Sequence, residues 1–291
     1  MNSIDIESKK FLGQPKNFVS IFNALLFDGQ QVLKPEYLKD ENSELVMNVS
    51  SKHVDIIKRY EDGTYLDLFV IESQSYVDQC MVARVMEYEC VARMRYIRQN
   101  FKKHVPMHTR LPMILTVVLY VGESKWNAAK RLSELEIIHP GFEDMFNEFK
   151  LNLIELNTNH KYNTGEKATQ DFFDLLRMIY RKQVLKEDLD REFNRDALYF
   201  AYVVTKNKEL LNIYQESEKG DVKVCRALDE MFEESTNKGI QMGIKQGIEQ
   251  GIALNQFEVY QTMLDKGFSV KAIASIFSVS EESIKTLLMK A

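Results

Sequence analysis

The chain has 291 residues, of which 45% are hydrophobic and 28% charged, proportions typical of a soluble globular protein. Its net charge of −5 gives no overall attraction to nucleic acid, so a nucleic-acid-binding role requires a local basic surface. There is no apolar run long enough for a membrane span, and the polar, acidic start does not resemble a secretory signal. The three cysteines show no C-x-x-C spacing and no disulfide framework. We therefore expect a cytoplasmic protein without a membrane partner.

The first 30 residues predict two helices. Apolar and polar residues are spaced helically over residues 3–11. Pro15 suits the first position of a second helix, which Asp28-Gly29 would end. Residues 30–50 are interpreted as a polar connection.

Two β-prone runs predict a hairpin over residues 52–74, with the turn signal Asp62-Gly63 between them. Glu72 and Gln74 lie two residues apart at the end of the second run. A strand therefore places both side chains on one face.

The length of the hairpin connection decides which residue lies opposite Glu72. A four-residue connection at 62–65 places Asp55 across from Glu72, whereas a two-residue turn at 62–63 places it across from Val70, on the same face. In both cases two carboxylates and an amide converge, which predicts a site for a hard divalent cation such as Mg²⁺. The alternative is that Asp55 begins a strand at the solvent edge and that the polar end is only a loop.

A long helix is expected over residues 79–103, with Arg84 and Tyr88 on neighbouring turns of one face. No Asp or Glu occurs from Cys90 to Gly122. The basic residues within this stretch are Arg93, Arg95, Arg98, Lys102, Lys103 and Arg110. They would either follow a DNA phosphate backbone or form a solvated cationic face.

The apolar run at 112–121 predicts a buried strand, and residues 151–156 predict another. With the elements before them, the first 160 residues follow the order α-α-β-β-α-β-β, which indicates an α/β fold. The domain hypothesis has three parts: a core at 1–160, a helical extension packed on or beside it at 161–235, and a tail at 236–291.

In the tail, a Gly-Ile pair recurs with a period of four, beginning at Gly239, Gly243, Gly247 and Gly251. Because each interior glycine costs roughly 1 kcal/mol of helix propensity, the repeat indicates either close approach to a partner helix or a flexible connector. Residues 269–288 resemble a helix-turn-helix pair with Ser280 as the second N-cap. Glu281 and Glu282 would face phosphates with negative charge, which favours a packing or docking module over DNA readout.

Several of these motifs occur in the same order in the recombination-promoting nucleases, also described as putative YhgA-like transposases. The resemblance covers roughly residues 3–135, and the glycine-repeat tail is similar to the usual C-terminus of that family. It is carried by Asp5–Leu12, Leu26–Pro35, Asp55, Ile71-Glu72-Ser73-Gln74, Met81–Tyr88, Leu111–Gly122 and Trp126.

This resemblance implies the PD-(D/E)XK nuclease superfamily, with an α-β-β-β-α-β core, and cleavage of DNA linked to recombination or mobile elements. Asp55 and Glu72 would bind Mg²⁺ or Mn²⁺. Asp5 or Glu7 would add a third acid from the first helix, with Asp5 preferred.

The resemblance also identifies a departure from the superfamily. Gln74 stands where many relatives have Lys, so Arg84, assisted by Tyr88, would restore a positive charge. The predicted catalytic residues are Asp55, Glu72, Gln74 and Arg84, and the predicted DNA-binding residues are Arg93, Arg95, Arg98, Lys102 and Lys103.

Two other functions compete with the endonuclease. One is a catalytically silent interaction protein that retains the fold and forms a homo-oligomer through the Gly-Ile helix. The other is a DNA-binding regulator that uses the terminal helical pair.

Overall fold

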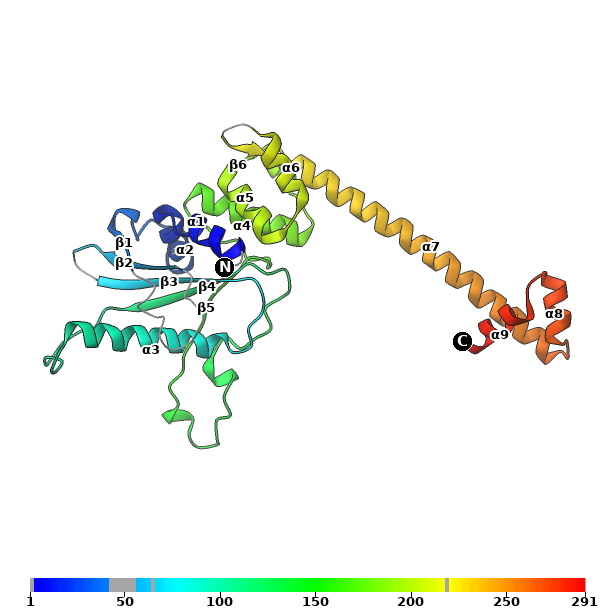
Figure 1. The fold of residues 1–291 in the computed structure, drawn as a ribbon, viewed down its shortest axis with the longest axis horizontal. Coiled ribbons are helices and arrows are strands. Elements are labelled where there is room, and N and C mark those ends of the chain that lie inside the picture. The colour runs from blue at the N-terminus through cyan, green and yellow to red at the C-terminus, as the bar shows by residue number, and fades with distance from the viewer. Residues whose placement is uncertain (1–2, 42–55, 64–65, 218–219, 291) are drawn as a thin grey trace. The chain divides into compact units, whose positions relative to one another are not determined.

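A computed structural model describes residues 3–41, 56–63, 66–217 and 220–290 (Figure 1). The chain divides into two compact units, Met1–Asp229 and Glu230–Ala291. Among the described residues, no helix is both long and apolar enough to cross a membrane.

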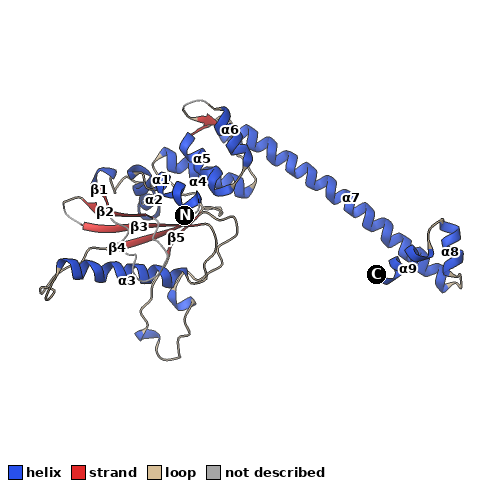
Figure 2. Cartoon of the chain, in the orientation of Figure 1, coloured by secondary structure: helices blue, strands red, loops and turns tan. Residues whose placement is uncertain are grey.

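The first unit is a mixed α/β structure built on a five-stranded sheet with the order β1-β2-β3-β4-β5 (Figure 2). β1 pairs antiparallel with β2, and β2 antiparallel with β3, whereas β3, β4 and β5 run parallel to one another. The strands are β1 (Leu38–Asp40), β2 (Ile56–Glu61), β3 (Leu66–Gln74), β4 (Ile114–Tyr120) and β5 (Asn152–Glu155).

The two N-terminal helices are confirmed as α1 (Ser3–Leu12) and α2 (Pro15–Phe27). Pro15 occupies the first turn of α2, where its missing N–H has no intrahelical partner to lose. Asp28 ends the helix in the left-handed region at φ 50°.

The hairpin is confirmed, and its pairing is that of the longer connection. Ile56 lies opposite Ile71 and Glu61 opposite Leu66, so residues 62–65 join the strands. Asp55 lies outside the described residues.

The segment interpreted as a polar connection, residues 30–50, contains two short elements that the sequence did not predict, the 3₁₀-helix η1 (Pro35–Tyr37) and β1; residues 42–50 lie outside the described chain. Only three residues long, β1 has too little apolar pattern to predict. Its contacts with β2 include the ion pair between Lys58 and Asp40 at 2.6 Å, and these long-range contacts hold it as an edge strand.

Helix α3 (Met81–Asn100) lies along one face of the sheet, and α1, α2, α4 and α5 lie along the other (Figure 1). Helix α3 begins two residues later and ends three residues earlier than predicted. The core beneath α3 consists of Ile57, Leu68, Val70, Tyr88, Ala92 and Ile114. On the opposite face, Phe22 of α2 packs on Phe69 of β3, with ring centroids 4.7 Å apart.

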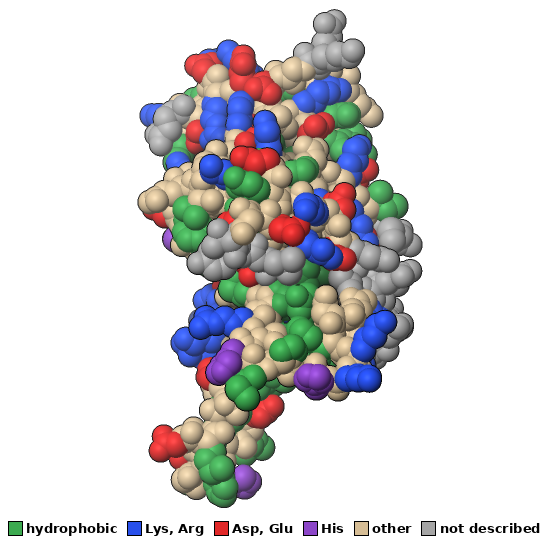
Figure 3. Space-filling model, turned by 90° about the vertical axis from the view of Figure 1, so that its left-hand side faces the viewer, with side chains coloured by type: hydrophobic (Ala, Val, Ile, Leu, Met, Phe, Trp, Pro, Cys, Tyr) green, Lys and Arg blue, Asp and Glu red, His purple; other side chains and the backbone are tan. Residues whose placement is uncertain are grey.

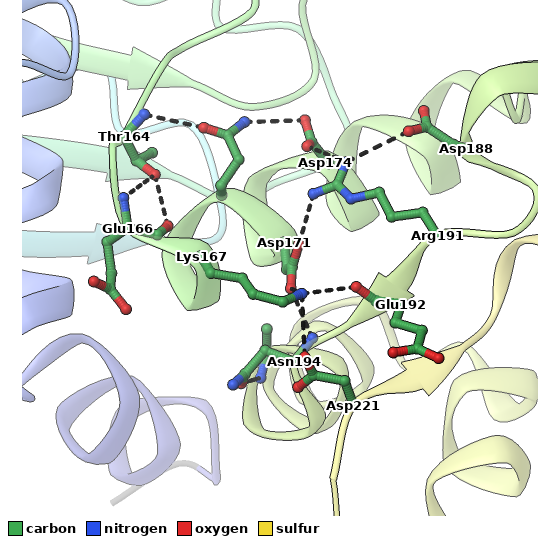
Figure 4. A network of polar contacts seen from close by, with 12 residues as sticks. Thr164, Glu166, Lys167, Asp171, Asp174, Asp188, Arg191, Glu192, Asn194 and Asp221 are labelled. Atoms are coloured by element: carbon green, nitrogen blue, oxygen red, sulfur yellow. Dashed lines mark hydrogen bonds and ion pairs between the residues drawn. The ribbon is translucent and has the colours of Figure 1, made fainter.

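After the sheet, where the sequence predicts a helical extension, the structure has α4 (Lys167–Arg181) and α5 (Arg195–Thr205). A network of polar contacts ties α4 to the segment before α5 (Figure 4). In it, Arg191 donates to the buried carboxylates of Asp171 at 2.6 Å and Asp174 at 2.8 Å. The remaining elements of this unit are η3 (Leu132–Glu134), η4 (Glu143–Met145), η5 (Lys186–Asp188), α6 (Lys208–Glu216), and the two-stranded sheet of β6 (Glu192–Phe193) and β7 (Val222–Lys223).

The Gly-Ile repeats lie in the long helix α7 (Cys225–Asp265), which begins in the first unit. The predicted terminal pair is confirmed as α8 (Val270–Phe277) and α9 (Glu281–Lys290). Ser280 caps α9 by accepting from the backbone N–H of Ser283 at 3.1 Å. The core of this second unit is formed by Tyr260, Ile273, Ala274 and Ile284.

Candidate metal centre at the end of strand β3

The polar residues at the carboxyl end of β3 are buried. Glu72 and Gln74 are each only 4% exposed. Both alternate in phase with Leu68 and Val70, which pack beneath α3, so their side chains are on the α3 face of the sheet. Parallel pairing with β4 sets Gln74 beside Tyr120 and protects this strand end from solvent on its β4 side.

Arg84, in the first turn of α3, joins the helix to the end of the strand. Its Nη2 donates to Oε1 of Glu72 at 3.2 Å, and its Nη1 donates to Oδ2 of Asp78. Nε and Nη2 both donate to the hydroxyl of Tyr88, at 3.1 and 2.8 Å. The structure thus brings together three of the residues singled out in the sequence: Glu72, Arg84 and Tyr88.

The protonation of this cluster follows from its burial and its contacts. Burial alone would lower the pKa of Arg84, but the hydrogen bonds with Asp78 and Tyr88 and the charge of Glu72 outweigh it and raise the pKa. Burial also raises the pKa of Tyr88, and the hydrogen bond from Arg84 opposes this shift. Arg84 therefore stays a cation and Tyr88 a neutral phenol at physiological pH.

Asp78 is the member of this cluster that the sequence reasoning missed. Its side chain is 17% exposed and pairs with Arg84, and its Oδ1 accepts from the backbone N–H of Cys80 at 2.9 Å. An Asp side chain that accepts from the backbone N–H two residues later forms an Asx-turn, which is common in loops. That signal predicts the turn but not the ion pair.

Gln74 contributes a buried amide. Within the described part of the chain, its Nε2 atom has no hydrogen-bond partner. A buried donor of this kind is costly to leave unsatisfied, so its presence favours a role in binding a group from outside the chain.

The described residues contain no group of three or more His, Cys, Asp or Glu side chains that could hold a metal ion. Of the predicted metal ligands, the structure describes Glu72 and Asp5, whereas Asp55 lies outside the described residues. A magnesium ion needs only one or two protein carboxylates besides water and substrate phosphate, so the chemistry of Glu72 fits such an ion once a second acid joins it.

Helix α1, which carries the predicted third acid, contacts the same strand end on the face opposite Glu72. Ser8 of α1 donates to the hydroxyl of Ser73 at 3.3 Å. Ser73 alternates with Glu72 and Gln74 and so lies on the opposite face. Asp5 is one helical turn before Ser8, and Glu7 pairs with Lys10 at 3.7 Å.

The predicted DNA-binding residues of α3 lie toward its opposite end. Arg93 is nine residues beyond Arg84, about 14 Å along the helix axis, and it pairs with the buried Glu89 at 2.8 Å. Arg95 and Arg98 lie farther on, and Lys102 and Lys103 follow the helix end. Figure 3 shows Lys and Arg side chains on both sides of two histidines at the level of the end of α3.

A comparison with models of protein families shows which family the chain belongs to. A model described as "Putative transposase, YhgA-like" matches residues 9–210. The chain belongs to this family. The match confirms the resemblance drawn from the sequence motifs, and it indicates a role connected with mobile elements. No curated protein and no solved structure matches this YhgA-like chain.

Proposed function

We propose that this YhgA-like protein is a divalent-metal-dependent DNA endonuclease that hydrolyses phosphodiester bonds, linked to recombination or mobile elements. The observation that carries the proposal is the buried carboxylate of Glu72 at the end of β3, held by Arg84 and followed by the buried amide of Gln74 on the same face. Buried ionisable groups of this kind cluster at functional sites.

The order of helices and strands supports the endonuclease proposal. The helix α2, the three strands β1, β2 and β3, the helix α3 and the strand β4 follow one another in the α-β-β-β-α-β order of the PD-(D/E)XK nucleases that the motifs resemble. In this arrangement Glu72 lies on β3, the strand that pairs antiparallel with β2 on one side and parallel with β4 on the other.

Asp55 is proposed as the second acid of the site. The hairpin register, extended by one residue beyond the pair of Ile56 and Ile71, would set position 55 opposite Glu72. The described cluster of Glu72, Asp78 and Arg84 carries one net negative charge when all three are ionised. A further carboxylate would match the charge of a divalent cation.

In this proposal Glu72 and Asp55 would hold Mg²⁺ or Mn²⁺, with Asp5 as the candidate third acid. When bound, the ion supplies a Lewis acid for the phosphate charge and lowers the pKa of a bound water. The guanidinium of Arg84 fixes the orientation of Glu72, and Tyr88 fixes Arg84. The amide of Gln74 would orient the attacking water by hydrogen bonding, in place of the Lys that is common in the superfamily.

Plasmid nicking with Mg²⁺ or Mn²⁺ tests the proposal. Wild type should nick supercoiled DNA, whereas Glu72→Gln and Asp55→Asn should not, because each removes a carboxylate charge and keeps the side-chain shape. Glu136→Gln, at an exposed acid outside the cluster, is the matched control and should retain activity. A purified wild type that cuts no DNA and binds neither metal in calorimetry would overturn the endonuclease proposal.

The second candidate function is assembly through α7. Four isoleucines of the Gly-Ile repeats are more than half exposed, namely Ile240, Ile244, Ile248 and Ile252. The glycines beside them have no described atom within 4 Å of where a Cβ would stand, so the helix backbone is open to close approach. Two such helices could bury this apolar stripe against each other, which would make the protein a homo-oligomer with or without nuclease activity.

A further inference from the structure

A second polar site lies between the segment after β5 and the end of α4. It is a cavity of about 170 Å³. Its described lining carries three cationic side chains, Lys161, Arg177 and Arg181, together with the amide of Asn159 and one acid, Asp188.

The charge of this cavity is positive. Lys161 and Arg181 are exposed, and neither pairs with an acid within the described part of the chain. Arg177 pairs with Asp174 at 2.8 Å, and Asp188 pairs with Arg191 at 3.5 Å. Lys161 and Arg181 are therefore the two cations available to bind an anionic ligand.

Chain neighbours of the lining residues fix both sides of the cavity to the end of β4. Asn157, two residues before the lining residue Asn159, donates to the carbonyl oxygens of Gly122 at 3.2 Å and Ser124 at 2.7 Å. Tyr180, directly before the lining residue Arg181, donates to the carbonyl oxygen of Val121.

The end of β4 is joined directly to the candidate metal centre. The backbone N–H of Val121 donates to the carbonyl oxygen of Gln74 at 2.9 Å. The cavity and the buried Glu72 therefore lie at the same edge of the sheet, where the parallel strands end. Open α/β sheets bind their ligands at this edge.

The size of the cavity indicates the part of a ligand that it holds. Sites for whole small molecules are usually about 300 to 1,000 Å³, so this cavity is too small for a nucleotide but sufficient for a phosphate group with water. Arginine and lysine together are suited to phosphate, since the guanidinium binds two oxygens and the ammonium adds a point charge.

We propose that Lys161, Arg177 and Arg181 form a subsite for a backbone phosphate of the nucleic acid bound at the end of β3. The proposal rests on the endonuclease function above and assigns DNA positioning to this edge of the sheet. The basic end of α3 lies away from the strand end, since Arg93 is about 14 Å along the helix from Arg84.

The test is DNA binding without cleavage. Anisotropy of a fluorescent duplex, titrated with the full chain in EDTA at several salt concentrations, gives the affinity and its salt dependence. The double variant Lys161→Gln/Arg181→Gln should bind roughly tenfold to a hundredfold more weakly, and the slope of log affinity against log salt should fall in magnitude by about one, the value for one phosphate. Lys208→Gln/Lys223→Gln, at two exposed lysines of α6 and β7 without described acid partners, is the charge-matched control and should bind like wild type.

The outcomes separate this inference from the endonuclease proposal. If wild type binds and cuts DNA, and the pocket variant binds with unchanged affinity and slope, the subsite is overturned while the nuclease stands. If wild type binds no duplex in EDTA, the subsite is overturned, whereas the endonuclease proposal is decided by nicking with Mg²⁺ or Mn²⁺. If inorganic phosphate binds wild type and not the pocket variant in calorimetry, but DNA affinity is the same for both, the cavity holds free phosphate and the backbone assignment is wrong.

Discussion

Arg84 donates from Nη2 to Oε1 of Glu72 across 3.2 Å, so the first turn of α3 is tied to the carboxyl end of β3. Both side chains are largely buried, with 17% and 5% exposed. The same guanidinium contacts Asp78 and Tyr88. Arg84 therefore couples the orientation of Glu72 to the first turn of α3.

Arg84→Gln should destabilise the first unit strongly. Removing the guanidinium takes away the described ion pairs with the buried Glu72 and with Asp78, a loss of about 3 to 5 kcal/mol in the free energy of unfolding. Urea titration monitored by the fluorescence of Trp126, which is the single tryptophan and is buried, measures it. The control Lys10→Gln breaks an exposed pair with Glu7 and should cost about 0.5 kcal/mol or less. Equal losses in the two variants would show that the contact with Glu72 contributes no more to the free energy of unfolding than an exposed ion pair.

Gln74→Met separates stability from activity. Methionine is similar in size to glutamine and removes a buried donor that lacks a described partner, so stability should stay equal or rise by about 1 kcal/mol. DNA cleavage should fall, because the amide that orients water is lost. Thr116→Val is the matched control: its hydroxyl is also buried without a described partner, but it lies on β4 away from the strand end. A Gln74→Met protein that cuts like Thr116→Val would remove Gln74 from the site.

Local signals explain which elements could be predicted from the sequence. Pro15 and Asp28-Gly29 mark both ends of α2, and Asp62-Gly63 marks the hairpin turn. By contrast, β1 carries no such mark, because its place in the sheet depends on pairing with residues about 20 positions later, such as Leu38 with Tyr60.

The same distinction applies to the candidate site. The spacing of two between Glu72 and Gln74 and of four between Arg84 and Tyr88 predicts shared faces, and the structure has them. The pairing of Asp78 with Arg84 depends on the path of the loop before α3. The phosphate-sized cavity joins residues from the loop after β5 and from α4, and no local pattern places these together.

Arg191→Gln should destabilise the helical part of the first unit by about 1.5 to 3 kcal/mol, because Asp171 and Asp174 would lose the charged hydrogen bonds of their shared partner and keep Lys167 and Arg177 as their described cationic partners (Figure 4). Thermal unfolding followed by circular dichroism measures the loss. Arg226→Gln, which breaks a pair with Asp190 in which both side chains are 71% exposed, is the control and should shift the midpoint little. A small shift in both variants would contradict a structural role for the network.

The three cysteines should differ in reactivity. Cys80 and Cys90 are exposed, whereas Cys225 is buried, and burial raises the pKa of its thiol to about 12. Because the thiolate is the reactive form, a disulfide reagent at pH 8 should modify two thiols quickly and the third only in denaturant. The raised pKa also means that Cys225 contributes stability below pH 9, the ordinary value, and that this contribution is lost as the pH rises toward 12. Three equally fast thiols in the native protein would contradict the buried position of Cys225.

The glycines of α7 distinguish assembly from a plain connector. Gly243→Ala/Gly247→Ala should stabilise an isolated helix, since each glycine costs roughly 1 kcal/mol relative to alanine and the described chain leaves open space at both positions. If a second copy packs closely against the glycines, the two added methyl groups obstruct it, so we expect a lower mass in sedimentation than for wild type. Gln246→Ala/Gln250→Ala raises helix propensity on the same helix without changing the Gly-Ile pairs and should keep the wild-type mass. A mass that is the same in wild type and both variants would identify α7 as a connector, because only a packed interface responds to methyl groups at the glycines and not to alanines elsewhere.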